Sequence, residues 1–167
     1  SSSIQVASNV SNVYSLPTIG YDAWGSQLGN KDEFPFFVRT TISNRNFVRA
    51  VSKLFAHFTW RRVALLSTGP NLNGALTEDV ANQFEKEFGG EIVYNGVGFG
   101  ADTLSSKDPS DDDIERLAQS GDLVRHVLEI KRRGARIIYL NTAGGTLGQA
   151  AHSAALRALQ AGGCISE

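Results

Sequence analysis

Segments with helix-like and strand-like spacing of apolar residues alternate along this chain, and this alternation constrains the fold more than any other feature. The segments 62–67 and 136–140 are apolar runs of strand length, which is typical of strands buried on both faces. Elsewhere apolar residues recur every three or four positions, which predicts helices with one buried face. From residue 45 onward we expect helices at 47–58, 76–88, 122–133 and 148–161 and strands at 62–67, 91–99 and 136–140. This order predicts the α/β class, with a Rossmann-like parallel sheet covered by helices on both faces.

The start of the chain follows the alternation less closely. Apolar residues at helical spacing predict a helix over 4–14, opened by serines that suit a helix N-terminus. Two short extended runs, 16–21 and 34–40, predict two strands. We therefore expect this part to belong to a different portion of the fold from the regular alternation that follows it.

A polar, acidic segment at 100–121 interrupts the pattern. Within it, Pro109 and Ser110 precede three aspartates, which is typical of a helix N-terminus because carboxylates are favoured there. A cation site at Asp111–Asp113 is the alternative. Three consecutive helical residues point in different directions, however, so we expect no metal at this run.

The composition excludes several classes of function. Lys and Arg number 16 against 17 Asp and Glu, which argues against a nucleic-acid partner because phosphate contacts need a local basic excess. A single cysteine, Cys164, excludes an internal disulfide and a cysteine-rich metal site. The 167 residues suffice for one globular domain or a large piece of one. With no Met anywhere and an abrupt start and stop, we expect an excised fragment of a longer protein, a processed chain being the alternative.

No catalytic constellation stands out in the sequence. His57, His126 and His152 lie within expected helices and have no metal-ligand spacing such as H-E-x-x-H. Cys164 lacks an obvious histidine partner, and neither a G-x-S-x-G elbow nor a P-loop occurs. We therefore predict that the chain is not an enzyme and holds no metal and no cofactor.

Two small polar loops follow expected strands. Residues 67–74 come after one strand, and residues 143–148 come after another. In open parallel sheets such loops lie at the crevice where ligands bind, and main-chain N–H groups at a helix start suit anions. A ligand crevice and a pair of ordinary strand-to-helix turns both fit this pattern. A nucleotide-dependent enzyme using 143–148 stays open as a rival, although the G-x-G-x-x-G fingerprint is absent.

Four segments taken together resemble a known family. They are Leu16–Ala23 (LPTIGYDA), Leu28–Lys31 (LGNK), Phe34–Thr40 (FPFFVRT) and Phe58–Leu66 (FTWRRVALL), with a weaker match through 134–140. The set is similar to the receptor ligand-binding region of the type I periplasmic-binding-protein superfamily. Members include natriuretic-peptide receptor cyclases, class C G-protein-coupled receptors and bacterial branched-chain amino-acid binding proteins.

The resemblance implies two α/β lobes that close on a small ligand like a flytrap. The chain would cross between the lobes at the Arg-Thr segment, so that residues 1–41 form part of lobe one and residues 42–167 form most of lobe two. We expect apolar faces of 1–41 to lack part of their packing, and hence this part to be the less stable one. In this family the lobe-one helix often forms a dimer contact, which makes a homodimer through lobe one a further expectation.

The resemblance also implies ligand-binding residues. In amino-acid-sensing members a serine opening the first helix holds the ligand's carboxylate, and the residues after the tyrosine of the next strand contact the ligand. The loop after the first lobe-two strand usually presents an aromatic residue to the ligand's ammonium group, and a leucine stands there in this chain. The expected ligand-binding residues are Ser1, Ser2, Asp22, Ala23, Trp24, Leu72, Asn141 and Thr142.

Two of these residues depart from the pattern of amino-acid receptors. Asp22 would attract an amine or repel a carboxylate, and Trp24 offers a stacking or cation–π face. A capped turn and a core indole are the alternative interpretations of this pair.

The function expected from the resemblance is ligand binding. The chain would be part of the extracellular region of a transmembrane signalling receptor at the plasma membrane, binding an amino acid, an amine or a small anion. A soluble periplasmic solute-binding protein is the alternative within the same fold.

Overall fold

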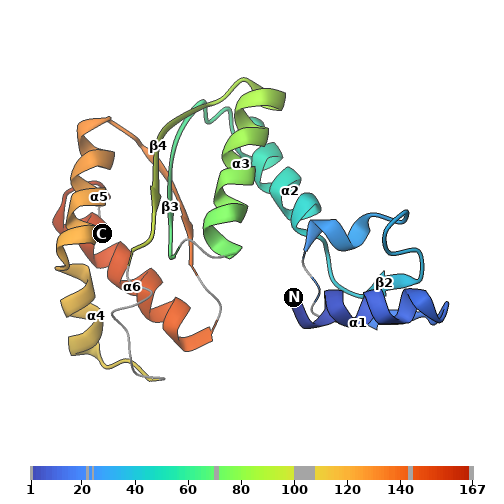
Figure 1. Cartoon of the computed structure of the whole chain (residues 1–167). Coiled ribbons are helices and arrows are strands. Elements are labelled where there is room, and N and C mark those ends of the chain that lie inside the picture. Colours follow the sequence, from blue (N-terminus) through green and yellow to red (C-terminus); the bar gives the residue numbers. More distant parts are fainter. Residues whose placement is uncertain are drawn as a thin grey trace. The chain divides into compact units, whose positions relative to one another are not determined.

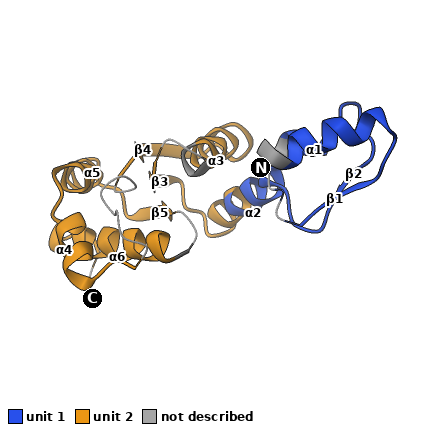
Figure 2. Ribbon diagram, turned by 60° about the horizontal axis from the view of Figure 1, so that its bottom comes forward, with its two compact units in different colours: residues 1–51 blue, residues 52–167 orange. Residues whose placement is uncertain are grey.

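The computed structural model describes residues 2–21, 23, 25–69, 72–99, 108–142 and 145–165. It divides into two compact units, residues 1–51 and residues 52–167 (Figure 2). The division falls within a helix, whereas the expected lobe boundary lies between residues 41 and 42. The assignment of the two parts to lobes one and two stays a prediction.

The second unit contains a parallel three-stranded sheet of order β4-β3-β5 (Figure 1). Its elements are β3 (Arg62–Ser67), α3 (Leu72–Phe88), β4 (Glu91–Val97), α4 (Asp111–Ala118), α5 (Gly121–Arg132), β5 (Ile137–Asn141) and α6 (Gly145–Ala161). The central strand β3 is buried from Val63 to Ser67, as its continuous apolar run predicts. In the register, Ser67 pairs with Val97 on one side and Asn141 on the other. The predicted α/β class and parallel sheet are confirmed.

Helices cover both faces of this sheet (Figure 2). Ala64 and Leu66 of β3 belong to a core with residues of α4, α5 and α6. The alternate residues of a strand point to the other face. On that face Phe55 packs edge-on against Phe84 of α3 at 5.3 Å between ring centroids and against Tyr139 of β5 at 5.8 Å. Helices on both faces of the sheet are what the alternation of strands and helices predicts.

The first unit is built from short elements around a small core. They are α1 (Ser2–Val13), β1 (Thr18–Gly20), the 3-10 helix η1 (Ser26–Gly29), β2 (Phe37–Arg39) and the beginning of α2 (Asn44–His57). The two strands pair in parallel, and Arg39 of β2 donates hydrogen bonds to the carbonyl oxygens of Ala23 and Gly25, both at 2.9 Å. Ala23, Leu28, Phe34 and Phe37 form the buried core, with Ile4 packed against it.

The expected helices and strands are present, but α1, α2, α3 and α6 begin two to four residues earlier than predicted. α3 begins at Leu72 and α6 at Gly145, so residues 145–148 form helix where the sequence indicated loop. Glycine near a helix start costs little, because the first N–H groups of a helix have no intrahelical partner anyway. The two strand-to-helix connections are therefore short.

The acidic run at the start of α4 is a helix N-terminus. The Ser110 hydroxyl accepts a hydrogen bond from the Asp113 main-chain N–H, and the Asp113 carboxylate accepts from the Ser110 N–H in return. Arg157 of α6 pairs with Asp111 at 2.8 Å and with Glu115 at 3.3 Å. These contacts account for Asp113 by capping and for Asp111 by ion pairing.

Neither a membrane span nor a metal site is found in the described part of the chain. Across the described ranges, no helix combines the length and the apolar character needed to cross a bilayer. Within the same ranges, no three His, Cys, Asp or Glu side chains are grouped so that they could hold a metal ion.

Candidate ligand-binding site

The carboxyl ends of the three parallel strands in the second unit form one edge, which we call the carboxyl edge. Two main-chain hydrogen bonds continue the sheet there. The Thr68 N–H donates to the Asn141 carbonyl oxygen at 3.1 Å, and the Gly98 N–H donates to the Ser67 carbonyl oxygen at 3.0 Å. In open α/β sheets this edge is where ligands bind.

Three polar side chains lie together behind this edge, between the sheet and α3. We call Ser67, Thr77 and Asn141 the edge cluster. The Asn141 side-chain Nδ2 donates to the Thr77 Oγ1 at 2.9 Å, and Thr77 is fully buried. Ser67, the register partner of Asn141, is also fully buried, and its Oγ has no hydrogen-bond partner among the described residues. Buried polar groups are nearly always paired, so the Ser67 hydroxyl is an exception within this cluster.

The carboxyl edge is electrically neutral in its side chains. Its described residues 67–69, 96–99 and 141–142 include no charged side chain. Both α3 and α6 begin at this edge, and the unpaired N–H groups of a helix start carry partial positive charge. The edge therefore offers hydrogen-bonding groups and favours neutral or anionic ligand groups over cations.

Three of the expected ligand-binding residues meet at the carboxyl edge. Leu72 is the first residue of α3, Asn141 is the last residue of β5, and Thr142 follows it. Asn141 and Thr142 are half-buried. Their common location follows from parallel topology, because the carboxyl ends of neighbouring parallel strands meet at one edge.

The remaining expected residues belong to the first unit. Ser2 is the first residue of α1, and Ala23 is 1% exposed in the small core, with its carbonyl oxygen bound to Arg39. Ser1, Asp22 and Trp24 lie outside the described residues. The roles of these five residues in ligand binding stay predictions.

Ser67 and Thr77 were not among the residues expected at the site. A signal for each exists in the sequence. Ser67 is the one polar residue at the carboxyl end of an otherwise apolar strand, and Thr77 lies three and seven residues before Val80 and Phe84, on the buried face of α3. A hydroxyl at such positions is buried by the fold and needs a partner there.

A second polar arrangement lies between β4 and α5. The Tyr94 Oη and the His126 Nδ1 are 2.6 Å apart, and the Arg133 guanidinium lies over the Tyr94 ring at 5.2 Å from its centroid. Burial raises the pKa of Tyr94 and lowers the pKa of His126. The neutral forms of both groups are therefore favoured, and the arrangement is a packed hydrogen bond within the α/β layer.

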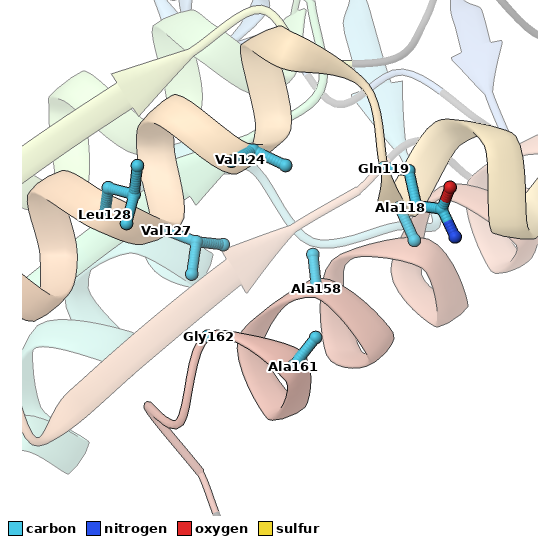
Figure 3. Close-up of a pocket in the computed structure, with 8 residues that line it drawn as sticks. All are labelled: Ala118, Gln119, Val124, Val127, Leu128, Ala158, Ala161 and Gly162. Atoms are coloured by element: carbon cyan, nitrogen blue, oxygen red, sulfur yellow. The ribbon is translucent and has the colours of Figure 1, made fainter.

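An apolar groove of about 330 Å³ lies on the outer surface of α4, α5 and α6 (Figure 3). Figure 3 shows short aliphatic side chains from α5 facing alanines of α6 across it. Its lining residues are Ala118, Gln119, Val124, Val127, Leu128, Ala158, Ala161 and Gly162. None of the expected ligand-binding residues lines this groove, so it is separate from the carboxyl edge.

A parallel sheet with helices on both faces is the architecture of a lobe of the periplasmic-binding-protein type. The chain matches the family described as "Receptor family ligand binding region" over residues 1–156. It therefore belongs to that family. The family consists of receptor ligand-binding regions and not of enzymes, which confirms the prediction of a binding module and removes the nucleotide-dependent enzyme as an alternative.

Individual relatives are receptors. Taste receptor type 1 member 2 of Saimiri sciureus is 29% identical over 141 residues, which are 83% of this chain and 16% of the relative. Metabotropic glutamate receptor-like protein E of Dictyostelium discoideum is 24% identical over 139 residues, with the same two shares. Taste receptor type 1 member 2 of Pan troglodytes is 36% identical over 66 residues. The chain thus spans about one-sixth of the length of these first two relatives.

Proposed function

We propose that this chain is part of the extracellular ligand-binding region of a transmembrane signalling receptor, and that it binds a small molecule between two lobes. The observation that carries the proposal is the neutral carboxyl edge, where hydrogen-bonding groups from two strand-to-helix connections meet without any catalytic constellation in the described residues. Membership of the receptor ligand-binding family supports the same function.

In this proposal residues 1–41 contribute part of lobe one and residues 42–167 most of lobe two. A ligand that touches both lobes favours their closed arrangement. It shifts the equilibrium only by as much as it binds the closed form better than the open form. The signal is then the change in population of the closed form, which further parts of the receptor convert into an output.

The proposed ligand is an amino acid, an amine or a small anion. Lobe one would contribute Ser1, Ser2, Asp22, Ala23 and Trp24, and lobe two would contribute Leu72, Asn141 and Thr142. The leucine cannot supply the aromatic face that cations prefer, so an ammonium group would depend on the carboxylate and the indole of lobe one.

Isothermal titration of the two-lobed region tests this proposal, with the twenty amino acids, simple amines and phosphate as probes. We expect at least one probe to bind, and the variants Asp22→Ala, Trp24→Ala and Asn141→Ala to weaken its binding. Leu128→Ala is the matched control, because Leu128 is 58% exposed on the separate groove. The proposed site is wrong if all three site variants bind every detected probe as tightly as the wild type does.

The alternative within the same fold is a soluble periplasmic solute-binding protein. The gene that encodes this chain distinguishes the two, because a receptor has a span of about 20 apolar residues downstream of the ligand-binding region. A signal peptide followed by a stop after the second lobe would favour the solute-binding protein.

We also propose a homodimer through lobe one. The helix α1 leaves Val6, Val10 and Val13 more than half exposed, and their spacing places them on one face of the helix. Sedimentation of the two-lobed region tests this, with Val10→Asp expected to shift dimer to monomer. A monomer at every concentration of the wild type contradicts the proposal.

A further inference from the structure

One residue of β5 contacts both the residue that follows β3 and a residue in the second turn of α3. The main-chain oxygen of Asn141 accepts a hydrogen bond from the Thr68 N–H at 3.1 Å, where the connection begins. Its side-chain Nδ2 donates to the Thr77 Oγ1 at 2.9 Å, in the second turn of the helix that follows. Asn141 therefore holds the start of the connection with its backbone and the second turn of α3 with its side chain.

The Thr77 hydroxyl is not needed to fill space. Thr77 is fully buried on a helix face that continues with the apolar residues Val80 and Phe84. Valine has nearly the same shape as threonine and would occupy this position without a buried polar group. The buried hydroxyl accepts a hydrogen bond from the half-buried Asn141 amide, which a valine side chain could not do.

We propose that Thr77 is a positioning residue of the ligand site, which acts through Asn141 to hold the start of α3 against the end of β5. The role of Thr77 in ligand binding rests on the proposed function, whereas the contact between Thr77 and Asn141 does not. Leu72 is the first residue of α3, and Thr142 directly follows Asn141. Asn141, Thr142 and the beginning of α3 then act as one unit at the ligand site.

Ser67 provides a matched comparison within the same cluster. It is as buried as Thr77, and it pairs in register with Asn141 on the neighbouring strand. Its hydroxyl, however, has no partner. Removing the Ser67 hydroxyl therefore removes a buried polar atom at the same edge without breaking the contact between Thr77 and Asn141.

Hydrogen exchange measured by NMR on the 167-residue chain tests the contact without any ligand. In Thr77→Val we expect the Asn141 side-chain amide and the Thr68 main-chain amide to exchange about tenfold faster than in the wild type. Thr77→Ser keeps the hydroxyl and should restore slow exchange. Ser67→Ala should leave both reporters unchanged. The amide of Ala64, in the middle of β3, reports on the stability of the whole unit.

Two results would overturn the inference. One is unchanged exchange of both reporters in Thr77→Val, which would show that the hydroxyl holds nothing. The other is an equal acceleration of hydrogen exchange at Ala64 and at the two reporters, which would show a general loss of stability. Failure of Thr77→Ser to restore slow exchange would have the same meaning.

Titration of the two-lobed region with glycine, glutamate and phosphate supplies the second readout. We expect Thr77→Val to weaken the binding of whichever probe the wild type binds, and Thr77→Ser to restore it. Equal binding by wild type and Thr77→Val overturns the link to the ligand site. If the wild type binds none of the probes in this or the wider titration, the proposed function fails, while the exchange experiment still decides the contact.

Discussion

Tyr94 on β4 and His126 on α5 share a hydrogen bond of 2.6 Å between Oη and Nδ1, within the layer that joins the sheet to the helix. Gly96 lies beside this pair, since a Cβ atom built there would be 2.8 Å from the His126 Nδ1. Arg133 stacks over the Tyr94 ring and donates to the Val93 carbonyl oxygen at 2.8 Å. The pair therefore occupies a closely packed position that a glycine makes available.

The stability of the chain should decrease in mild acid because of His126. Burial lowers its pKa from the ordinary value of 6.5, the nearby Arg125 lowers it further, and Asp122 opposes both. The folded chain therefore binds fewer protons than the unfolded chain just below pH 6.5, so the free energy of unfolding falls as the pH falls through that value. Denaturant unfolding between pH 8 and pH 5 measures this.

Two variants separate the histidine from other titrating groups. In His126→Gln the free energy of unfolding should depend less on pH in this window than in the wild type. Tyr94→Phe should keep most of the wild-type dependence, because burial is the main cause of the shift and the ring remains. Both variants keep Glu129 and Arg133, whose charges influence the pKa of Tyr94. Equal pH dependence in wild type and His126→Gln would contradict the prediction.

Gly96→Ala should destabilise the second unit. The added methyl group would be 2.8 Å from His126, 2.9 Å from the Tyr94 ring and 3.0 Å from Leu66, all closer than ordinary contact. Overpacking of this kind costs about 1–3 kcal/mol of unfolding free energy. Gly121→Ala is the control, because a Cβ there meets nothing within 4 Å and its effect should be neutral or slightly stabilising. Denaturation midpoints measure both, and equal effects would show that the space beside His126 is not the cause.

Loss of the N-terminal cap of α4 should also be measurable. Ser110→Ala removes the hydroxyl that accepts a hydrogen bond from the Asp113 N–H, which is one half of the reciprocal pair, and should lower the unfolding free energy by about 1 kcal/mol. Ser120 caps α5 with a single longer contact of 3.4 Å to the Leu123 N–H, so Ser120→Ala should cost less. Thermal or denaturant unfolding ranks the two variants, and the reverse order would contradict the capping-box interpretation.

Main-chain amides of the first unit should exchange faster than those of the second. Among the described residues, the buried core of the first unit includes four side chains, whereas the core against α4, α5 and α6 includes fifteen. Less buried apolar surface leaves less free energy to oppose local opening. Hydrogen exchange with mass-spectrometric detection compares peptides of α1 with peptides of α5. Slower exchange in α1 would show that the first unit is the more stable one.

The sequence predicts the fold of the second unit closely. The bounds of β3 agree with the apolar run 62–67. A strand buried on both faces is a continuous apolar run, so the sequence itself shows where the strand begins and ends. The beginnings of α3 and α6 were placed too late. Leu72 and Gly145 stand beside glycine and small polar residues, and there the local sequence does not distinguish the first turn of a helix from a loop.

The candidate site was predictable only in part. Leu72, Asn141 and Thr142 were expected at the ligand site from the family resemblance, and the parallel topology places all three at one edge of the sheet. The contact between Thr77 and Asn141 joins residues 64 positions apart, and no local pattern indicates such a partner. The 3-10 helix at Ser26–Gly29 was likewise not predicted, since four residues are too few to show a period.

The sequence by itself determined the alternation of strands and helices, the parallel sheet, the family and the neutral character of the carboxyl edge. These properties depend on residue type and on periods of two or about four residues, which can be read along the chain. Only the tertiary structure decided which hydroxyls are buried, that Asn141 is bonded to Thr77 while Ser67 is left without a partner, and that His126 lies against Gly96 and Tyr94. Such pairings depend on packing between segments that are far apart in the sequence. Burial there increases the free-energy cost of a missing hydrogen bond or a lost contact.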